Sequence, residues 1–188
     1  MKVKDLLNDL LDESQMKQTL LSIYDNRNDI DKFYVGYVAE IFDDSILIFS
    51  YNENGEEDGY LLIRLVDIFK IEKESIYLDS LNILIKQNVS TGGRQNKKFK
   101  KGGEGGIAEI TSMCHEQKIL VSIKLIYEDF IAGYVVKEDD EYLLIEKYSK
   151  TGMRDGYSLI WFSDIQNIHF DGKEEKNLIK LLKTSVLP

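Results

Sequence analysis

Cysteine and histidine are the side chains in this chain best suited to catalysis or metal binding, and only three are present. Cys114 and His115 are adjacent, and His169 is the other histidine. A structural zinc site needs four ligands, and a cysteine nucleophile needs a histidine base that a third group orients. Only folding that joins distant residues could assemble either site, so we predict no metal, no cofactor and no catalytic activity.

Two acidic runs and a glycine-rich segment also lack the spacing of a known site. The runs 56–58 and 138–141 do not have the alternating oxygen ligands and final glutamate of an EF-hand loop. We interpret both as solvated hairpin loops. The glycines between residues 92 and 106 are not followed by the Gly-Lys-Ser/Thr of a phosphate-binding loop.

The tripeptide Asp58-Gly59-Tyr60 recurs as Asp155-Gly156-Tyr157, and could form two equivalent ligand pockets. We favour a turn, because aspartate accepts hydrogen bonds in turns and glycine adopts a positive φ. Asp67 and Asp164 recur in the same way. They could contact a partner, although we favour a role as acceptors of backbone hydrogen bonds at a bend.

A basic segment contrasts with the net charge of −9, which disfavours general attraction to nucleic acid or anionic membrane. Residues 86–107 carry six basic side chains against one acidic one. Its centre, Lys97-Lys98-Phe99-Lys100-Lys101, could bind RNA phosphates with Phe99 stacked on a base. It could also dock on acidic surfaces of its own chain. We favour a solvated linker.

The chain contains one pattern twice. Residues 58–71 recur 97 positions later as residues 155–168, and the match extends without a gap from Phe33/Phe130 to Leu84/Leu181. Two copies are too few for a solenoid or a propeller, so the repeat indicates two similar small domains or one pseudo-symmetric pair.

Hydrophobic periodicity predicts the same elements in each copy. In the first copy we expect helices at 3–13 and 76–85 and strands at 19–24, 31–42, 45–51, 60–65 and 68–71. In the second we expect a helix at 108–117, strands at 118–126, 129–137, 142–148, 157–162 and 165–170, and a closing helix around 178–182. Gly36 and Gly133 lie inside the second strand of each copy, which marks a bulge, a bend or a close backbone approach.

Five short, bent strands tend to close into a small barrel, because closure removes exposed edges. We therefore predict a mainly β protein with two tandem five-stranded barrels of SH3-like size, each with a short N-terminal helix. The first barrel would span residues 1–87, a basic glycine-rich linker 88–107, and the second barrel with a C-terminal helix 108–188.

Each copy resembles the Sm-like (LSm-type) family of small barrels over residues 3–72 and 108–169. The resemblance rests on the N-terminal helix, on Gly36 and Gly133 in a bent strand, and on Leu62-Ile63-Arg64 followed by Ile68 and Ile71. It implies the barrel fold for both copies.

The resemblance does not extend to the RNA pocket of the family. The base-contacting asparagine falls on Ile46 and Leu143, and the glycine after the arginine falls on Leu65 and Phe162. In the second copy the arginine itself is replaced by Trp161. The resemblance therefore implies the fold without RNA binding by that pocket.

Eleven tyrosines exceed what two small cores require, and Tyr and Trp are enriched at protein interfaces. We therefore predict a non-catalytic protein that acts through protein contacts or self-association. An RNA-associated role for the basic linker 94–101 is the alternative. The candidate interaction residues are Arg64, Trp161, Lys97, Lys98, Phe99, Lys100 and Lys101.

The composition also bears on location. A single cysteine excludes an internal disulfide and fits a reducing compartment, and no apolar run approaches the ~20 residues of a membrane span. We expect a bacterial cytoplasmic protein without a membrane partner.

Overall fold

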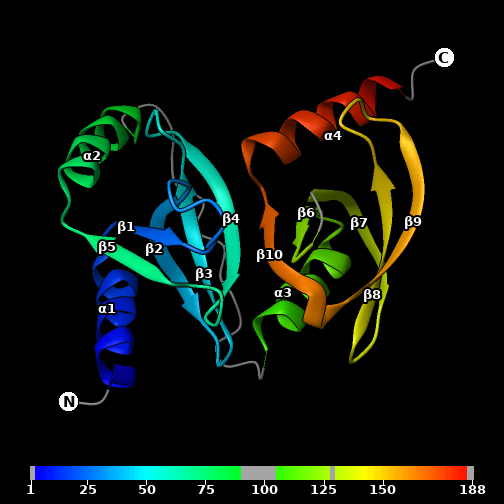
Figure 1. Cartoon of the computed structure of the whole chain (residues 1–188). Coiled ribbons are helices and arrows are strands. Elements are labelled where there is room, and N and C mark those ends of the chain that lie inside the picture. Colours follow the sequence, from blue (N-terminus) through cyan, green and yellow to red (C-terminus); the bar gives the residue numbers. More distant parts are fainter. Residues whose placement is uncertain (1–2, 90–104, 128–129, 186–188) are drawn as a thin grey trace. The chain divides into compact units, whose positions relative to one another are not determined.

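The structure is a computed structural model that describes residues 3–89, 105–127 and 130–185 (Figure 1). The described part is mainly β, as the sequence predicted. The elements are α1 (Val3–Lys17), β1 (Leu21–Tyr24), β2 (Tyr34–Ile41), β3 (Ser45–Tyr51), β4 (Glu57–Arg64), β5 (Lys70–Lys73), α2 (Ile76–Val89), α3 (Gly106–Gln117), β6 (Leu120–Leu125), β7 (Phe130–Glu138), β8 (Tyr142–Tyr148), β9 (Arg154–Trp161), the short 3-10 helix η1 (Phe162–Asp164), β10 (Ile165–Phe170) and α4 (Lys173–Ser185).

The second half of this order repeats the first. β8 and β9 lie 97 positions after β3 and β4, and α4 begins 97 positions after α2. Glu74 and Asp171, also 97 positions apart, both have left-handed backbone, with φ of 57° and 59°. α1 and α3 end 100 positions apart, at Lys17 and Gln117, because the loops between the first two strands of each copy differ in length.

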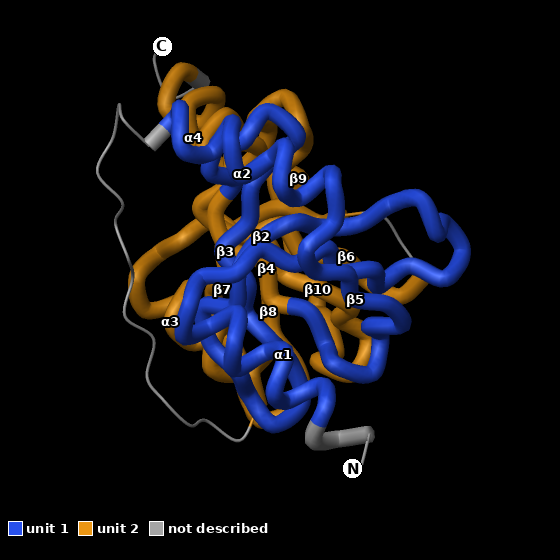
Figure 2. The backbone as a smooth tube through the Cα atoms, turned by 90° about the vertical axis from the view of Figure 1, so that its left-hand side faces the viewer, with its two compact units in different colours: residues 1–58, 63–104 blue, residues 59–62, 105–188 orange. Residues whose placement is uncertain are grey.

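The chain divides into two compact units (Figure 2). Unit 1 comprises residues 1–58 and 63–104, and unit 2 comprises residues 59–62 and 105–188. Strand β4 is thus divided, because its central segment Gly59–Leu62 belongs to unit 2.

In unit 1 the strand order is β5-β1-β2-β3-β4, with antiparallel ladders between β5, β1, β2 and β3. Helix α1 packs on β2 and continues to Lys17, beyond the predicted end at residue 13. The side chains of Ser14 and Gln15 cause the difference: although polar, they donate or accept hydrogen bonds that attach the helix to the strands. The core of this unit includes Leu11, Leu21, Ile23, Ile46, Leu47 and Ile48.

In unit 2 the order runs from the Gly59–Leu62 segment through β10-β6-β7-β8-β9. Helix α3 packs on β7 and α4 packs on β6. The buried Glu175 of α4 accepts hydrogen bonds from the Ser122 hydroxyl on β6 and from the Gly172 backbone N–H. The fully buried side chains of the core include Ile110, Ile123, Leu143, Ile145, Ile165, Ile168 and Phe170.

Both strand glycines lie at a close backbone approach, as predicted. A Cβ atom at Gly36 would lie 2.2 Å from the Phe49 carbonyl oxygen, and one at Gly133 would lie 2.1 Å from that of Glu146. A register shift follows in each ladder, after Val38 in β2 and after Val135 in β7. Each copy therefore has a bulged second strand immediately after its glycine.

The strand order is open, so the predicted closure of two barrels is not confirmed. Among the described strands, β5 pairs with β1 alone and β9 pairs with β8 alone. These two strands are therefore sheet edges, where backbone N–H and C=O groups are available for pairing with another chain.

Candidate interaction site on strand β9

Equivalent positions of the two copies differ sharply in exposure on β4 and β9. Tyr60 and Leu62 on β4 are 4% and 1% exposed, whereas Tyr157 and Leu159 on β9 are 54% and 49% exposed. Trp161, which follows in the same alternation, is also 49% exposed. We call Tyr157, Leu159 and Trp161 the β9 strip.

The alternation of a strand places the strip on one face of unit 2. Ile160, which points to the opposite face, is 3% exposed and belongs to the core. On the neighbouring strand, Trp161 lies opposite Tyr142, and the two rings meet edge to face at 6.1 Å. The strip is therefore a continuous apolar row at the edge of the sheet.

The backbone of the strip points away from β8. The Phe162 N–H donates to the Glu141 carbonyl, 2.8 Å away, so these two residues form a hydrogen-bonded pair. Because such pairs alternate along an antiparallel ladder, Ile160 and Ser158 are the next residues of β9 that bond to β8. The N–H and C=O groups of the three strip residues face the open edge.

Arg154 fixes the beginning of the strip. Its Nε donates to Glu146 Oε1 at 2.6 Å, and its guanidinium carbon lies 4.8 Å from the centre of the Tyr157 ring. The Tyr148 hydroxyl donates to the other Glu146 oxygen at 3.0 Å. Arg154, and after it Tyr148, lower the pKa of Glu146, so the carboxylate stays charged and holds Arg154 over Tyr157.

The counterpart of the strip in the first copy, on β4, is covered within unit 2. The ring of Tyr60 stacks on that of Phe170 at 5.2 Å, and a Cβ atom at Gly59 would lie 2.4 Å from the Phe170 carbonyl oxygen. Gly156 has the same left-handed backbone, with φ of 78°, yet nothing lies within 4 Å of its Cβ position. The β9 strip is therefore the uncovered counterpart of a covered surface.

Arg64 has a structural role at its position. Its Nε and Nη2 donate to the two carboxylate oxygens of Asp67, at 2.8 and 3.2 Å, and its side chain is 18% exposed. Both carboxylate oxygens of Asp67 thus accept hydrogen bonds from the Arg64 side chain.

Of the predicted interaction residues, Trp161 is therefore the one that the described part of the chain presents to solvent. Lys97, Lys98, Phe99, Lys100 and Lys101 lie outside the described residues.

The pair Cys114-His115 occupies the helix position that Ser14-Gln15 occupies 100 residues earlier. The Ser14 hydroxyl accepts from the Val38 N–H at 3.0 Å and donates to the Thr19 carbonyl at 2.7 Å. Cys114 is 1% exposed at the equivalent place in α3. The pair therefore lies at a helix-to-strand contact. No group of three or more His, Cys, Asp or Glu that could hold a metal ion occurs in the described ranges.

The repeated Asp-Gly-Tyr tripeptide lies inside strands β4 and β9, so its interpretation as a turn was wrong. The turn comes earlier, where the Gly55 N–H donates to the Asn52 carbonyl at 3.0 Å. The positive φ expected of Gly59 and Gly156 is present, at 75° and 78°. The glycines permit a left-handed residue at the start of each strand, where any other residue would be strained.

Tyr157 and Leu159 were not among the predicted site residues, because their counterparts in the first copy have the same residue types. The sequence difference that could have identified them lies between β10 and β5, the last strands of the two copies. The first copy's motif is covered by Phe170 of β10, whereas β5, the counterpart of β10, has Lys73 at the position of Phe170.

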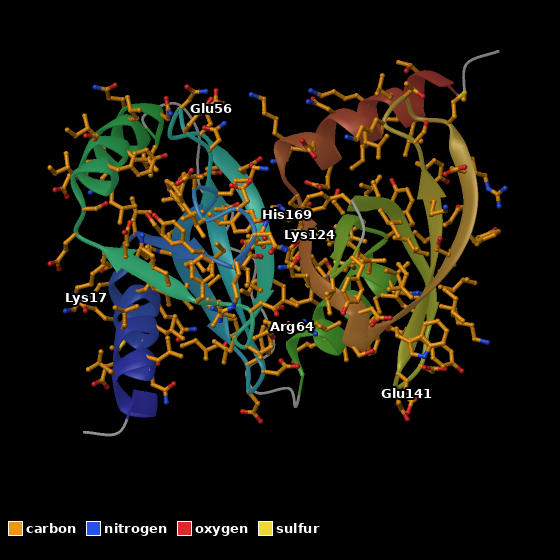
Figure 3. All side chains as sticks on the ribbon, viewed as in Figure 1. Lys17, Glu56, Arg64, Lys124, Glu141 and His169 are labelled. Atoms are coloured by element: carbon orange, nitrogen blue, oxygen red, sulfur yellow. The ribbon has the colours of Figure 1, made fainter. Side chains whose placement is uncertain are left out.

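His169 on β10 gives stability a pH dependence. Burial, and secondarily the nearby Lys124, lower its pKa from 6.5 to about 4 (Figure 3). The unfolded chain therefore binds more protons than the folded chain between these values, and stability is lost as the pH falls from 6.5 towards 4. Because the side chain keeps some exposure, we expect a loss of roughly 2 kcal/mol.

Urea unfolding at several pH values, compared between wild type and His169→Gln, measures this effect. The variant should lose most of the slope between pH 6.5 and 4. An unchanged slope would assign the pH dependence to other groups.

The described residues contain no helix that is long and apolar enough to cross a membrane. Comparison of the chain with family models, with curated proteins and with solved structures finds no match.

Proposed function

We propose that this chain is a non-catalytic, cytoplasmic protein-interaction module built from two Sm-like small barrels, and that the β9 strip makes the contact. The Sm-like interpretation is supported by the repeated order of a helix and five strands, and by Gly36 and Gly133 next to a bulge in each second strand.

The contrast between the two copies of one motif carries the functional proposal. Tyr60 and Leu62 are buried, and Phe170 stacks on Tyr60, whereas Tyr157 and Leu159 are half exposed. Covering the exposed half of a large aromatic side chain contributes roughly 2 kcal/mol, so an uncovered row of two aromatic side chains and a leucine favours a partner. Outward backbone groups beside an apolar row are suited to addition of a strand.

A photo-crosslinking amino acid placed at Trp161 in the producing cell tests this proposal. We expect protein adducts at Trp161 and few at Tyr127, an aromatic side chain in the loop after β6 that is 91% exposed. The comparison controls for exposure, because Tyr127 is more accessible to random collision than Trp161. Equal adducts at both positions, or none at either, would contradict an interface on β9.

The RNA-associated alternative gives a different result. It predicts a salt-sensitive shift of a labelled RNA oligonucleotide, lost when Lys97, Lys98, Lys100 and Lys101 are changed to alanine. A shift of that kind without adducts at Trp161 would favour the alternative.

A further inference from the structure

The two sheet edges of the chain differ in how open they are to pairing. β5 has four residues, Lys70–Lys73, and both terminal lysines are held in ion pairs. Lys70 Nζ lies 2.7 Å from Glu72 Oε1 and 4.2 Å from the centre of the Tyr24 ring, and Lys73 Nζ lies 2.9 Å from Glu13 Oε2. A short edge strand that carries lysines resists addition of another strand.

β9 has the opposite properties. It is eight residues long, and its exposed face carries two aromatic side chains and a leucine. A head-to-tail assembly would place this apolar strip against the charged β5 of the next copy, where Lys73 replaces the phenylalanine that covers Tyr60. The β5 strand of another copy would therefore cover β9 poorly.

We infer that the β9 strip is covered by the β9 strip of a second copy of this chain. The two strands pair antiparallel about a two-fold axis that passes beside Leu159. This inference rests on the proposed function and names the partner. A two-fold interface uses the same patch of both copies, which requires a self-complementary strand.

The backbone of the strip meets this requirement. With Leu159 opposite Leu159 of the second copy, Tyr157 lies opposite Trp161 of the second copy, and Trp161 opposite its Tyr157. All three are then hydrogen-bonded pairs, because their N–H and C=O groups face the open edge. This is the one two-fold register in which every strip residue meets a strip residue, and aromatic cross-strand pairs stabilise such ladders.

The charges around the strip fit the same register. Beyond the aromatic pair, Arg154 and Asp155 extend past the end of β9 in the second copy, towards its 3-10 helix η1 (Phe162–Asp164). Shifting the axis to Tyr157 would place the carboxylate of Asp155 opposite Leu159. The Leu159 register therefore pairs the strip residues without placing a charge opposite any of them.

Cysteine substitution tests both the partner and the register. Hydrogen-bonded cross-strand residues have Cα atoms about 5.5 Å apart, a spacing that a disulfide accepts. Leu159→Cys should therefore give a covalent dimer under mild oxidation, seen on a non-reducing gel. Wild type should not, because its single cysteine, Cys114, is buried.

Two further variants check the register. Tyr157→Cys and Trp161→Cys should each form no covalent dimer alone and should cross-link when they are mixed. Circular dichroism of each variant shows that it is folded. If Tyr157→Cys and Trp161→Cys cross-link alone as readily as when mixed, the disulfides come from random collision and the inference is overturned.

Light scattering during gel filtration gives a second measurement without cysteines. Wild type should approach twice the chain mass as the concentration rises, and Leu159→Lys should weaken this association at least about tenfold, because a charge at an edge strand opposes pairing. Tyr127→Lys is the matched control and should behave as wild type. A wild type that stays monomeric at every concentration contradicts the inference.

The inference and the proposed function fail separately. Trp161 adducts that contain a different protein, together with no covalent dimer of Leu159→Cys, would keep the proposed function and overturn the second copy as partner. A Trp161 photo-crosslinker that yields no adduct would remove both.

Discussion

Alanine at Gly36 or at Gly133 is expected to destabilise the folded chain by about 3 kcal/mol, the upper part of the range for overpacking of a well-packed interior. The added Cβ would lie 2.2 Å from the Phe49 carbonyl oxygen in the first case and 2.1 Å from that of Glu146 in the second. Each contact is with backbone of the next strand, so no side-chain rotation relieves it. The strands themselves must separate.

Chemical unfolding followed by circular dichroism measures this loss for each variant. Because Gly36 belongs to unit 1 and Gly133 to unit 2, the pair also reports on cooperativity. If the units unfold independently, each variant lowers the midpoint of one transition and leaves the other unchanged. If they unfold together, both variants lower the same midpoint. A change below about 0.5 kcal/mol in either variant, the size of an ordinary surface substitution, would contradict the close approach.

These glycines were predictable because the sequence has them at equivalent places in both copies. Gly36 and Gly133 each interrupt a strand pattern, and a glycine there usually marks close approach or a bulge. The structure contains both features, since a register shift follows each glycine. Element types were predictable for the same reason, because each copy supports the assignment made in the other.

The end of helix α1 was not predictable from hydrophobic periodicity. Polar residues near Ser14 interrupt the apolar pattern, which normally indicates a helix end. Ser14 is nevertheless fully buried, because its hydroxyl bonds to the Val38 N–H of β2. A polar side chain whose partner is backbone of another element gives no local signal of burial.

The candidate site was predictable only in part, because the exposure of its side chains depends on tertiary structure. Trp161 was identified because it differs from Arg64, whereas Tyr157 and Leu159 match their counterparts in type. Local sequence cannot distinguish a tyrosine that stacks on Phe170 from one that has no such neighbour. Exposure of the strip depends on the next strand in the order, and that strand is distant in sequence.

The second large effect is expected from one substitution made in both copies of the same motif. Gly59→Ala and Gly156→Ala place a Cβ on residues with nearly the same backbone, φ of 75° and 78°. Both variants have the strain of a left-handed alanine, about 1 kcal/mol. At Gly59 the new atom would also lie 2.4 Å from Phe170 O and from Gly172 N, whereas at Gly156 nothing lies within 4 Å.

We therefore expect Gly59→Ala to destabilise the chain by about 4 kcal/mol and Gly156→Ala by about 1 kcal/mol, when overpacking is added to the shared backbone strain. Unfolding of dilute protein measures the difference. Because the strain is common to both variants, the difference isolates the packing of β10 on the first copy of the motif, the contact that the β9 strip lacks. Equal losses would mean that β10 does not cover the first copy. The contrast between covered and uncovered motifs, on which the interface proposal rests, would then disappear.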